Sequence, residues 1–290
     1  MNKNYFIGIG FKLLNCLIFP TMSLLMVVSV SLVPIMQVFF LQVFLGAIFS
    51  FLFLFVIDAQ PSFSMSRRDL FLYLGRSITN LLAMKLWIFA LTTTGMNEAT
   101  ALGYTGPLWV FLMARYIIGE KFGFSILGLI FINIIGMLII IQPKYVDLHW
   151  QGIAASLGAI LLWSLYEIIC KIQTSTQHYM QQTFYFMAIS AIIVAPFAYN
   201  SWKSLNIQES NMMIVLALLA VANITAIFIA YSHAPITLLS PFSYARLIFT
   251  VILTSSLYNI IPAPHTFIGA AVIFLSNGYF IYKINKKSLN

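Results

Sequence analysis

Four basic side chains stand inside or beside long apolar stretches of the sequence: Lys12, Arg76, Lys85 and Arg246. A charge near the centre of a membrane helix costs about 2.5–3.5 kcal/mol on insertion scales, so such residues usually serve a function. A cation at that depth can hold the carboxylate or phosphate of a solute through charge-assisted hydrogen bonds. Lys85 and Arg246 have no acidic neighbour of matching depth in their own stretches. We therefore predict that both face one central cavity and together bind the anionic end of a substrate.

Further residues extend this predicted binding site. Arg76 lies near the start of the stretch that contains Lys85, and its role is open between a membrane anchor and a cavity residue. Tyr244 is close to Arg246 and is placed in the site with it. Trp87, Trp163 and Tyr104 lie too deep for the aromatic belt at the membrane interface. We expect them to line the cavity, with ordinary packing as the alternative.

Glu167 and Lys171 are four residues apart, with the glutamate first. This order favours an ion pair along one face of a helix, so the spacing predicts a structural pair. An ionisable residue within a span is often functional, so the binding of a cationic group by Glu167 is the alternative.

Glu120 directly follows a long apolar run in a chain that is poor in acids. It stands beside Lys121 and about one helical turn after Arg115, so a helix-end ion pair is the simplest interpretation. The alternative is a latch that is made and broken as an inner gate opens. Gly119 and Gly123 would give the backbone the freedom that such a latch needs.

Pro107 lies inside the same apolar run, after Gly103 and Gly106. Proline removes a backbone hydrogen bond and kinks a helix. In a membrane the kink is tolerated where a cavity or neighbouring helices satisfy the freed carbonyl group. We predict that this helix bends toward a water-filled centre, and a kink that faces lipid is the alternative.

The elements that carry these residues are membrane spans. Hydrophobic residues make up 61% of the 290 positions and charged residues only 8%, whereas soluble domains carry roughly 25% charged residues. A span needs about 20 mainly apolar residues. The sequence therefore predicts an all-α membrane protein with ten transmembrane helices, at residues 5–30, 34–57, 70–91, 97–117, 123–142, 151–171, 181–199, 211–231, 236–257 and 265–282.

Orientation follows from the basic residues of the short loops, because cytoplasmic loops are enriched in Lys and Arg. With a cytoplasmic N-terminus, only Lys144 and Lys203 fall outside. The inside loops and tails then hold nine bases: Lys3, Arg67, Arg68, Arg115, Lys121, Lys171, Lys283, Lys286 and Lys287. We expect a multi-pass protein of the cell inner membrane, embedded in lipid, with both termini in the cytoplasm.

Weak internal similarity indicates two related halves, residues 5–142 and 151–283. The stretch that begins at Ala101 can be laid on the one that begins at Ser240, with Gly128 falling on Gly269. Five spans per half is an odd number, so the second copy must enter the membrane from the opposite side. Inverted repeats of this kind surround the midplane site of many transporters.

Several function classes are disfavoured by the same residues. The sequence has no HExxH, no GxSxG and no Walker lysine loop, so we predict no catalytic residues, no metal site and no cofactor. Cys16 and Cys170 fall in apolar runs and are expected to be inert. The net charge of +8 is scattered singly, so we expect no nucleic-acid partner. A membrane-embedded enzyme that acts on lipid is the less favoured alternative to a carrier.

Residues 76–143 resemble the first half of the EamA branch of the drug/metabolite transporter superfamily. The matching features are an Arg that opens the third span, an ATA start to the fourth at 99–101, Pro107 and the closing pair Gly119–Glu120. SPFSYARLIF at 240–249 is similar to the family's second repeat. The chain departs from the family pattern at Gln42, where many relatives have Arg, and in the loop 259–265, which lacks a second Gly-Glu pair.

This resemblance implies two inverted five-helix repeats and alternating-access transport of a small organic metabolite. Deep cations, aromatic rings and Glu167 favour a zwitterionic or anionic substrate. The family includes S-adenosylmethionine carriers of host-dependent bacteria, and the Ile-, Asn- and Lys-rich composition resembles proteins of their AT-rich genomes. Uptake of S-adenosylmethionine is therefore the leading specific prediction. An exporter of amino acids or drugs with the same fold is the alternative, and a homodimer is a further open expectation.

Overall fold

The computed structural model describes residues 3–57, 66–94, 96–120, 124–142, 150–174, 178–258 and 263–287. Within these residues the secondary structure is helical and contains no strand. Ten helical segments are long and apolar enough to cross a membrane, and each coincides with one of the predicted spans. The predicted all-α fold class with ten candidate spans is therefore confirmed.

The first half of the chain forms the first five spans. Their elements are α1 (Lys3–Leu32), α2 (Ile35–Ile57), α3 (Arg67–Thr93), α4 (Met96–Gly103), α5 (Gly106–Met113), the π-helical turn η1 (Ala114–Ile118) and α6 (Phe124–Ile141). The second half forms the other five. Its elements are α7 (Trp150–Gln173), α8 (Tyr179–Tyr199), α9 (Ile207–His233), α10 (Ile236–Leu239), the 3-10 turn η2 (Ser240–Tyr244), α11 (Ala245–Tyr258) and α12 (Pro264–Lys287).

The fourth span is interrupted where the sequence predicts a bend. α4 ends at Gly103, and α5 begins with Pro107 in its first turn. Proline is tolerated there because the first amides of a helix lack an intrahelical acceptor. The span then widens into η1 and ends at Gly119, whose φ of 74° lies in the left-handed region that favours glycine. The amide of Glu120 then donates to the carbonyl oxygen of Ala114 at 3.2 Å.

The ninth span is interrupted as well. α10 gives way to η2, which carries Pro241 in its first turn, and regular α-helix resumes only at Ala245. The sequence analysis predicts one continuous span here. The fourth and ninth spans are thus both discontinuous, and discontinuous helices of this kind form the binding sites of many transporters.

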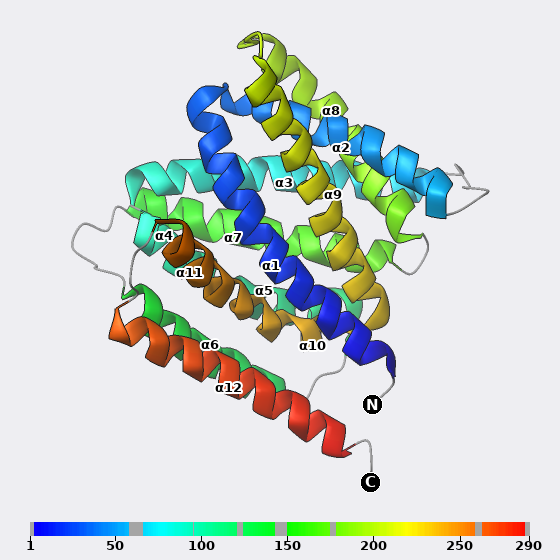
Figure 1. The fold of residues 1–290 in the computed structure, drawn as a ribbon. Coiled ribbons are helices and arrows are strands. Elements are labelled where there is room, and N and C mark those ends of the chain that lie inside the picture. The colour runs from blue at the N-terminus through cyan, green and yellow to red at the C-terminus, as the bar shows by residue number, and fades with distance from the viewer. Residues whose placement is uncertain are drawn as a thin grey trace.

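The most extensive helix packing joins the two halves of the chain. α1 lies along α9, α2 along α8, α3 along α7 and α6 along α12 (Figure 1). In the last pair a Cβ built on Gly269 would lie 2.5 Å from the carbonyl oxygen of Gly136. Glycine at these two positions therefore allows the backbones of α6 and α12 to touch. The chain ends marked in Figure 1 lie at the same end of the bundle.

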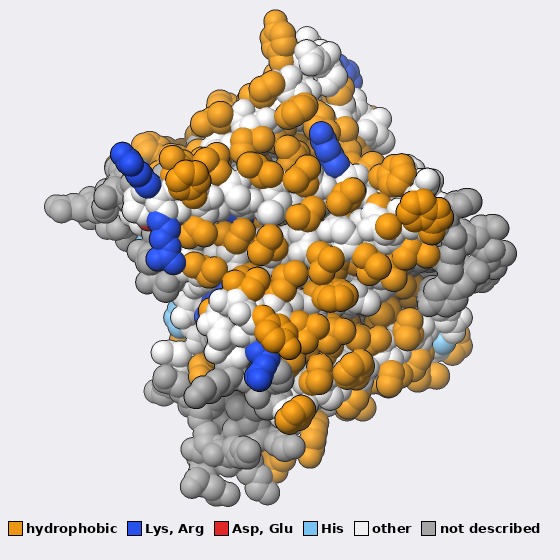
Figure 2. Space-filling view, turned by 180° about the vertical axis from the view of Figure 1, so that it is seen from behind, with side chains coloured by type: hydrophobic (Ala, Val, Ile, Leu, Met, Phe, Trp, Pro, Cys, Tyr) orange, Lys and Arg blue, Asp and Glu red, His pale blue; other side chains and the backbone are white. Residues whose placement is uncertain are grey.

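The outer surface of the bundle is apolar. On the face shown in Figure 2 hydrophobic side chains predominate and basic side chains are few. Large apolar side chains such as Val56, Phe71 and Phe124 are 81%, 73% and 86% exposed. Exposed apolar area on this scale requires a nonpolar surrounding. The protein is a multi-pass membrane protein.

Candidate functional site

Arg246 lies in the first turn of α11, directly after the irregular part of the ninth span. Its guanidinium carbon is 3.8 Å from the centre of the Phe19 ring of α1. The side chain is half-buried, and its buried Nε has no hydrogen-bond partner among the described residues. Since most buried polar groups are hydrogen-bonded, this donor is available to a ligand.

Tyr244 lies two residues earlier, in η2. Its ring stacks on Tyr104 with centroids 6.2 Å apart and planes 23° apart. The Tyr244 side chain is fully buried, and its hydroxyl has no hydrogen-bond partner in the described part of the chain. Tyr104 belongs to the break between α4 and α5. The two interrupted spans therefore meet through these two rings.

Two tryptophans continue the aromatic surface. The rings of Trp87 on α3 and Trp163 on α7 are 5.5 Å apart. Trp163 Nε1 donates to Asn80 Oδ1 at 3.1 Å, which fixes the indole ring. A Cβ built on Gly103 would lie 2.9 Å from the Trp87 ring, so α4 packs directly against that indole.

These contacts connect six residues of five spans, which we call the aromatic site: Phe19, Trp87, Tyr104, Trp163, Tyr244 and Arg246. Five of the six are predicted site residues, and the tryptophan pair reaches the others through Gly103, the neighbour of Tyr104. Phe19 is the addition. The arrangement can stack a planar group on its rings and give hydrogen bonds to an anionic group from Arg246 and Tyr244.

Lys85 does not join this group through any described contact. Its side chain is exposed, and its Nζ lies 5.1 Å from the centre of the Phe197 ring of α8. The contact of Arg246 is with α1 instead. We therefore leave Lys85 out of the aromatic site and treat the predicted joint role with Arg246 as a question for experiment.

Arg76 is fully buried, at 0% exposure, among aromatic rings. Its guanidinium carbon lies 4.0 Å from the Phe186 ring centre and 4.5 Å from that of Phe228, and Nη1 donates to Gln173 Oε1 at 2.9 Å. Tyr166 contributes a further ring at 5.2 Å. These contacts join α3 to α7, α8 and α9, and they do not test the two roles open in the sequence, a membrane anchor or a cavity residue.

Glu120 binds the start of the ninth span. Its carboxylate accepts hydrogen bonds from the amides of Ile236 (3.1 Å) and Thr237 (3.0 Å), and from the Thr237 hydroxyl at 2.8 Å. A carboxylate is favoured at a helix N-terminus because the first amide groups have no intrahelical acceptor. The helix-end ion pair stays a prediction, because Lys121 lies outside the described residues. Glu120 joins the fourth span to the ninth.

Lys171 binds the end of the eighth span, on the other side of the same turn. Its Nζ donates to the carbonyl oxygens of Ala234, at 2.9 Å, and Tyr231. A cation is favoured at the C-terminus of a helix. We call Glu120 and Lys171, with the turn 231–237 that they hold, the inner clamp. A pocket of about 280 Å³ lies against it, lined by Glu120, Lys171, Ser232, His233, Ala234 and Pro235.

The predicted ion pair between Glu167 and Lys171 is not formed, because each side chain has a partner on α9. The Tyr231 hydroxyl donates to Glu167 Oε2 at 2.5 Å, while Lys171 holds the Tyr231 carbonyl. On the opposite face of Tyr231, Lys12 Nζ lies 5.5 Å from the ring centre. Lys12 is fully buried, and its Nζ has no hydrogen-bond partner in the ranges that the structure describes.

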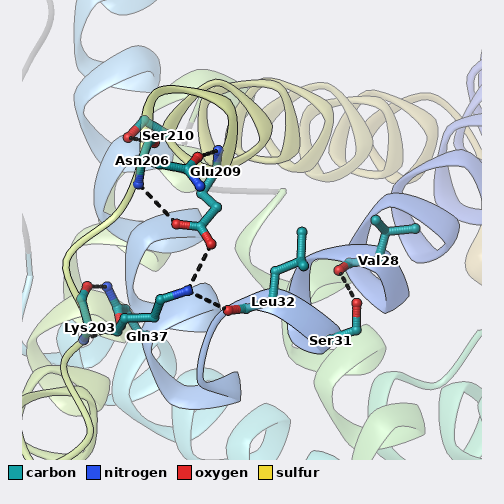
Figure 3. A network of polar contacts seen from close by, with 8 residues as sticks. All are labelled: Val28, Ser31, Leu32, Gln37, Lys203, Asn206, Glu209 and Ser210. Carbon is teal, nitrogen blue, oxygen red and sulfur yellow. Dashed lines mark hydrogen bonds and ion pairs between the residues drawn. The ribbon is translucent and has the colours of Figure 1, made fainter.

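A second polar network ties together the opposite end of the bundle (Figure 3). Lys203 Nζ pairs with Glu209 Oε1 at 2.8 Å and donates to the Leu32 carbonyl at 3.0 Å. The side chain of Gln37 exchanges two hydrogen bonds with the Lys203 backbone, at 2.7 and 2.9 Å. Because the predicted orientation places this end outside, we call Leu32, Gln37, Lys203 and Glu209 the outer lock.

The sequence identifies the charged residues of the inner clamp and of the Tyr231 contact, but it does not identify their hydrogen-bond partners. Tyr231 carries no local signal of its role, because a single tyrosine near the end of an apolar span does not indicate a partner. Thr237 and the amide of Ile236 lie 117 and 116 positions from Glu120, so no local pattern predicts their contact. The signal that was present is the turn SHAP at 232–235, which leaves free amides at the start of the next helix.

Comparison with known families decides the class of this protein. The model of the EamA-like transporter family matches the chain twice, at residues 6–142 and 150–280. The chain belongs to the EamA-like transporter family. Members of this family and the curated relatives below are named transporters, not enzymes. This EamA protein is accordingly a transporter.

Its curated relatives are distant and carry different names. An S-adenosylmethionine uptake transporter of Rickettsia bellii is 22% identical over 284 residues, which cover 98% of this chain and 96% of the relative. The pseudopaline exporter CntI of Pseudomonas aeruginosa is 18% identical, with 93% of this chain and 94% of the relative covered. A riboflavin transporter of Rhizobium johnstonii is 26% identical over 73% of this chain and 70% of its own.

A solved structure described as "Crystal structure of protein" has the same fold as this EamA chain. The TM-score is 0.80 at 15% sequence identity, and 93% of this chain and 96% of the other are covered. At this identity the likeness supports the fold and nothing about the substrate.

Proposed function

We propose that this transporter moves a small metabolite with an anionic group across the cytoplasmic membrane by alternating access, and that the aromatic site binds it. The observation that carries the proposal is the pair of buried donors, Arg246 Nε and the Tyr244 hydroxyl, that have no partner among the described residues. Both lie beside aromatic faces where the two interrupted spans meet. An anionic group would satisfy these donors, and a planar group would stack on the rings.

S-adenosylmethionine is the substrate that we put first. It combines a planar purine with a carboxylate, which suit the rings and Arg246 respectively. Relatives named S-adenosylmethionine uptake transporters align with nearly the whole chain. At 22–23% identity the name of a relative supports this choice without deciding it.

We also propose that residues 5–142 and 151–283 form inverted repeats. An exchange of the two halves replaces each span by the span five positions away, so that the third and sixth spans become the eighth and first. Under this exchange the packed pair α3–α7 becomes the packed pair α9–α1. The pairs α2–α8 and α6–α12 map onto themselves. The two interrupted spans, fourth and ninth, exchange as well. So do the capping boxes that begin α3, at Ser66 and Asp69, and α9, at Asn206 and Glu209. The two matches of one family model fit the same division.

The orientation that goes with this proposal has both termini in the cytoplasm of a bacterial cell. Nine bases lie in the inside loops and tails against two in the outside loops. Reporter fusions at Lys144 and Lys203 should read external. A cytoplasmic signal at either position would overturn the orientation and the naming of the outer lock and inner clamp.

The decisive experiment is uptake into proteoliposomes with a panel of labelled S-adenosylmethionine, amino acids and riboflavin. We expect saturable uptake of S-adenosylmethionine and counterflow when the vesicles are preloaded with the unlabelled compound. The solute should be recovered chemically unchanged. Counterflow of another member of the panel would replace the substrate, and the absence of counterflow for every solute would overturn the transport proposal.

The role of Arg246 is tested against that of Lys85. Arg246→Met should raise the apparent substrate constant at least about tenfold, because a hydrogen bond to a charged group contributes about 1.5–3 kcal/mol. Esterifying the substrate carboxylate should remove the difference from wild type. Lys85→Met is the matched variant, and an equal rise there would restore the shared anion site predicted from the sequence. Wild-type uptake by Arg246→Met would withdraw the aromatic site.

A further inference from the structure

Tyr231 joins three of the candidate membrane spans at one point. Its hydroxyl donates to Glu167 of α7, and its ring lies under the ammonium group of Lys12 of α1, while Tyr231 itself belongs to α9. Lys171, one turn after Glu167, also holds the Tyr231 carbonyl. The α1–α9 pair and the α3–α7 pair therefore meet at this residue.

The charges at this junction are unusual for their depth. Among the described spans, Glu167 is the carboxylate farthest from a helix end, since Asp69, Glu120 and Glu209 all stand at span termini. Lys12 and Tyr231 are both 0% exposed, and Lys12 Nζ has no acceptor in the described residues. Other titratable or charged groups that face the junction are Cys16, Arg76, Tyr166, Cys170, Lys171 and Arg246.

A proton fits this junction better than any other ligand. An organic solute has no room at Lys12, which is fully enclosed, and a metal cation would be repelled by the ammonium group. The described residues also contain no group of three His, Cys, Asp or Glu side chains that could ligate a metal. A proton needs only one carboxylate oxygen, and Glu167, half-buried, supplies it.

We propose that Glu167, Tyr231 and Lys12 form a proton-binding site that couples transport to the proton gradient. The proposal rests on the transport function above and adds its driving force. A proton from the outer medium binds Glu167, travels with the conformational change and is released to the cytoplasm. Tyr231 keeps its own proton throughout, and no covalent bond other than the O–H bond on Glu167 forms or breaks.

Protonation changes the contact that holds two helix pairs together. The bond from Tyr231 to a carboxylate is charge-assisted, and it becomes a weaker neutral bond once Glu167 is protonated. The junction then loses the negative charge of Glu167, so repulsion among its enclosed cations increases. Both effects loosen α9 from α7 and α1. Proton binding therefore favours separation of the helices that alternating access must move.

The test compares counterflow with gradient-driven uptake in proteoliposomes. Counterflow at equal pH on both sides requires no net proton movement, whereas an acidic outside should accelerate uptake by the wild type. Glu167→Gln, which mimics the protonated group, should retain counterflow and lose the acceleration. Lys12→Met and Tyr231→Phe should reduce the acceleration. Glu209→Gln, a matched carboxyl change at a span end, should respond to the gradient as wild type does.

A second measurement is independent of substrate. Infrared difference spectra of the purified protein between acidic and neutral pH should contain a protonated-carboxyl band that disappears in Glu167→Gln and persists in Glu209→Gln. Two results would overturn the proton site and leave the transport function standing. One is acceleration by an acidic outside that survives in Glu167→Gln. The other is a wild type that shows counterflow but whose uptake an acidic outside does not accelerate. Equal spectra for wild type and Glu167→Gln would overturn the proton site even if no substrate were found.

Discussion

The outer lock and the inner clamp both hold helix ends with charged side chains, but they do so in opposite ways. In the outer lock a half-exposed Lys203 pairs directly with Glu209, six residues along the chain. In the inner clamp Glu120 and Lys171 come from the fourth and sixth spans and bind backbone groups of one turn between the eighth and ninth.

The difference lies in what each network connects. The outer lock ties the turn between α1 and α2 to the start of α9, and its ion pair joins Lys203, whose side chain is 49% exposed, to a buried Glu209. Solvent reaches the lysine and screens the pair, so its contribution to stability is small. The inner clamp uses half-buried charges placed at the two helix ends that favour their sign. We infer that the clamp sets the conformational balance, while the lock fastens a loop.

Glu120→Gln should have the largest effect. The amide cannot accept all three hydrogen bonds that the carboxylate receives, and a bond to a charged group contributes about 1.5–3 kcal/mol. We expect the balance to shift toward an open inner face by about tenfold or more. Labelling of Ser240→Cys, at a position only 2% exposed, should accelerate by the same factor. Unchanged labelling would leave Glu120 a structural cap only.

Lys171→Met should have the next effect, about fivefold in the same labelling assay. It removes two bonds to carbonyl groups at the end of α9 but leaves the three bonds of Glu120 in place. The native Cys16 and Cys170 are buried and should contribute little background. A larger effect than that of Glu120→Gln would reverse the ranking of the two halves of the clamp.

Thr237→Val isolates one bond of the clamp. The substitution preserves shape and both backbone amides, and it removes only the hydroxyl that lies 2.8 Å from Glu120. A single side-chain bond suggests about a threefold rise in Ser240→Cys labelling. If Thr237→Val matched Glu120→Gln, the hydroxyl rather than the helix N-terminus would be the main partner of the carboxylate.

Lys203→Met should have the smallest effect. Lys203 is 49% exposed, and Glu209 keeps its bond from the Asn206 amide, so the loss of stability should stay under about 1 kcal/mol. Thermal unfolding in detergent measures the loss, and Ser240→Cys labelling should not accelerate. Acceleration comparable to that of Lys171→Met would remove the contrast between the two networks.

The sequence predicts most of the fold because its signals are local. Span lengths follow from hydropathy, and the bend of the fourth span follows from Pro107 alone. The sequence does not indicate the matching break at Pro241, since SPFSY begins only four residues after the predicted start of the ninth span and does not interrupt its apolar character. The positions of the spans along the chain can therefore be predicted, and helix continuity less so.

The direction of a side chain around its helix was predicted less well. In a soluble helix polarity separates the buried face from the exposed one, but in a membrane both faces are apolar. The sequence thus assigns Lys85 to a span without indicating which way its side chain faces, and the structure sets it against Phe197. The ion pair predicted from the Glu167–Lys171 spacing is wrong for a related reason. Carbonyl and hydroxyl groups of α9 bind both side chains inside the bundle.

The enclosure of Arg76 couples the conformation of the protein to the membrane voltage. Its guanidinium group is surrounded by rings, and Nε and Nη2 have no hydrogen-bond partner in the described residues. A fixed cation that crosses the whole membrane field gains about 2.3 kcal/mol per 100 mV. Any movement of α3 along the membrane normal carries this charge through part of that field. An inside-negative voltage therefore favours whichever conformation brings Arg76 nearer to the cytoplasm.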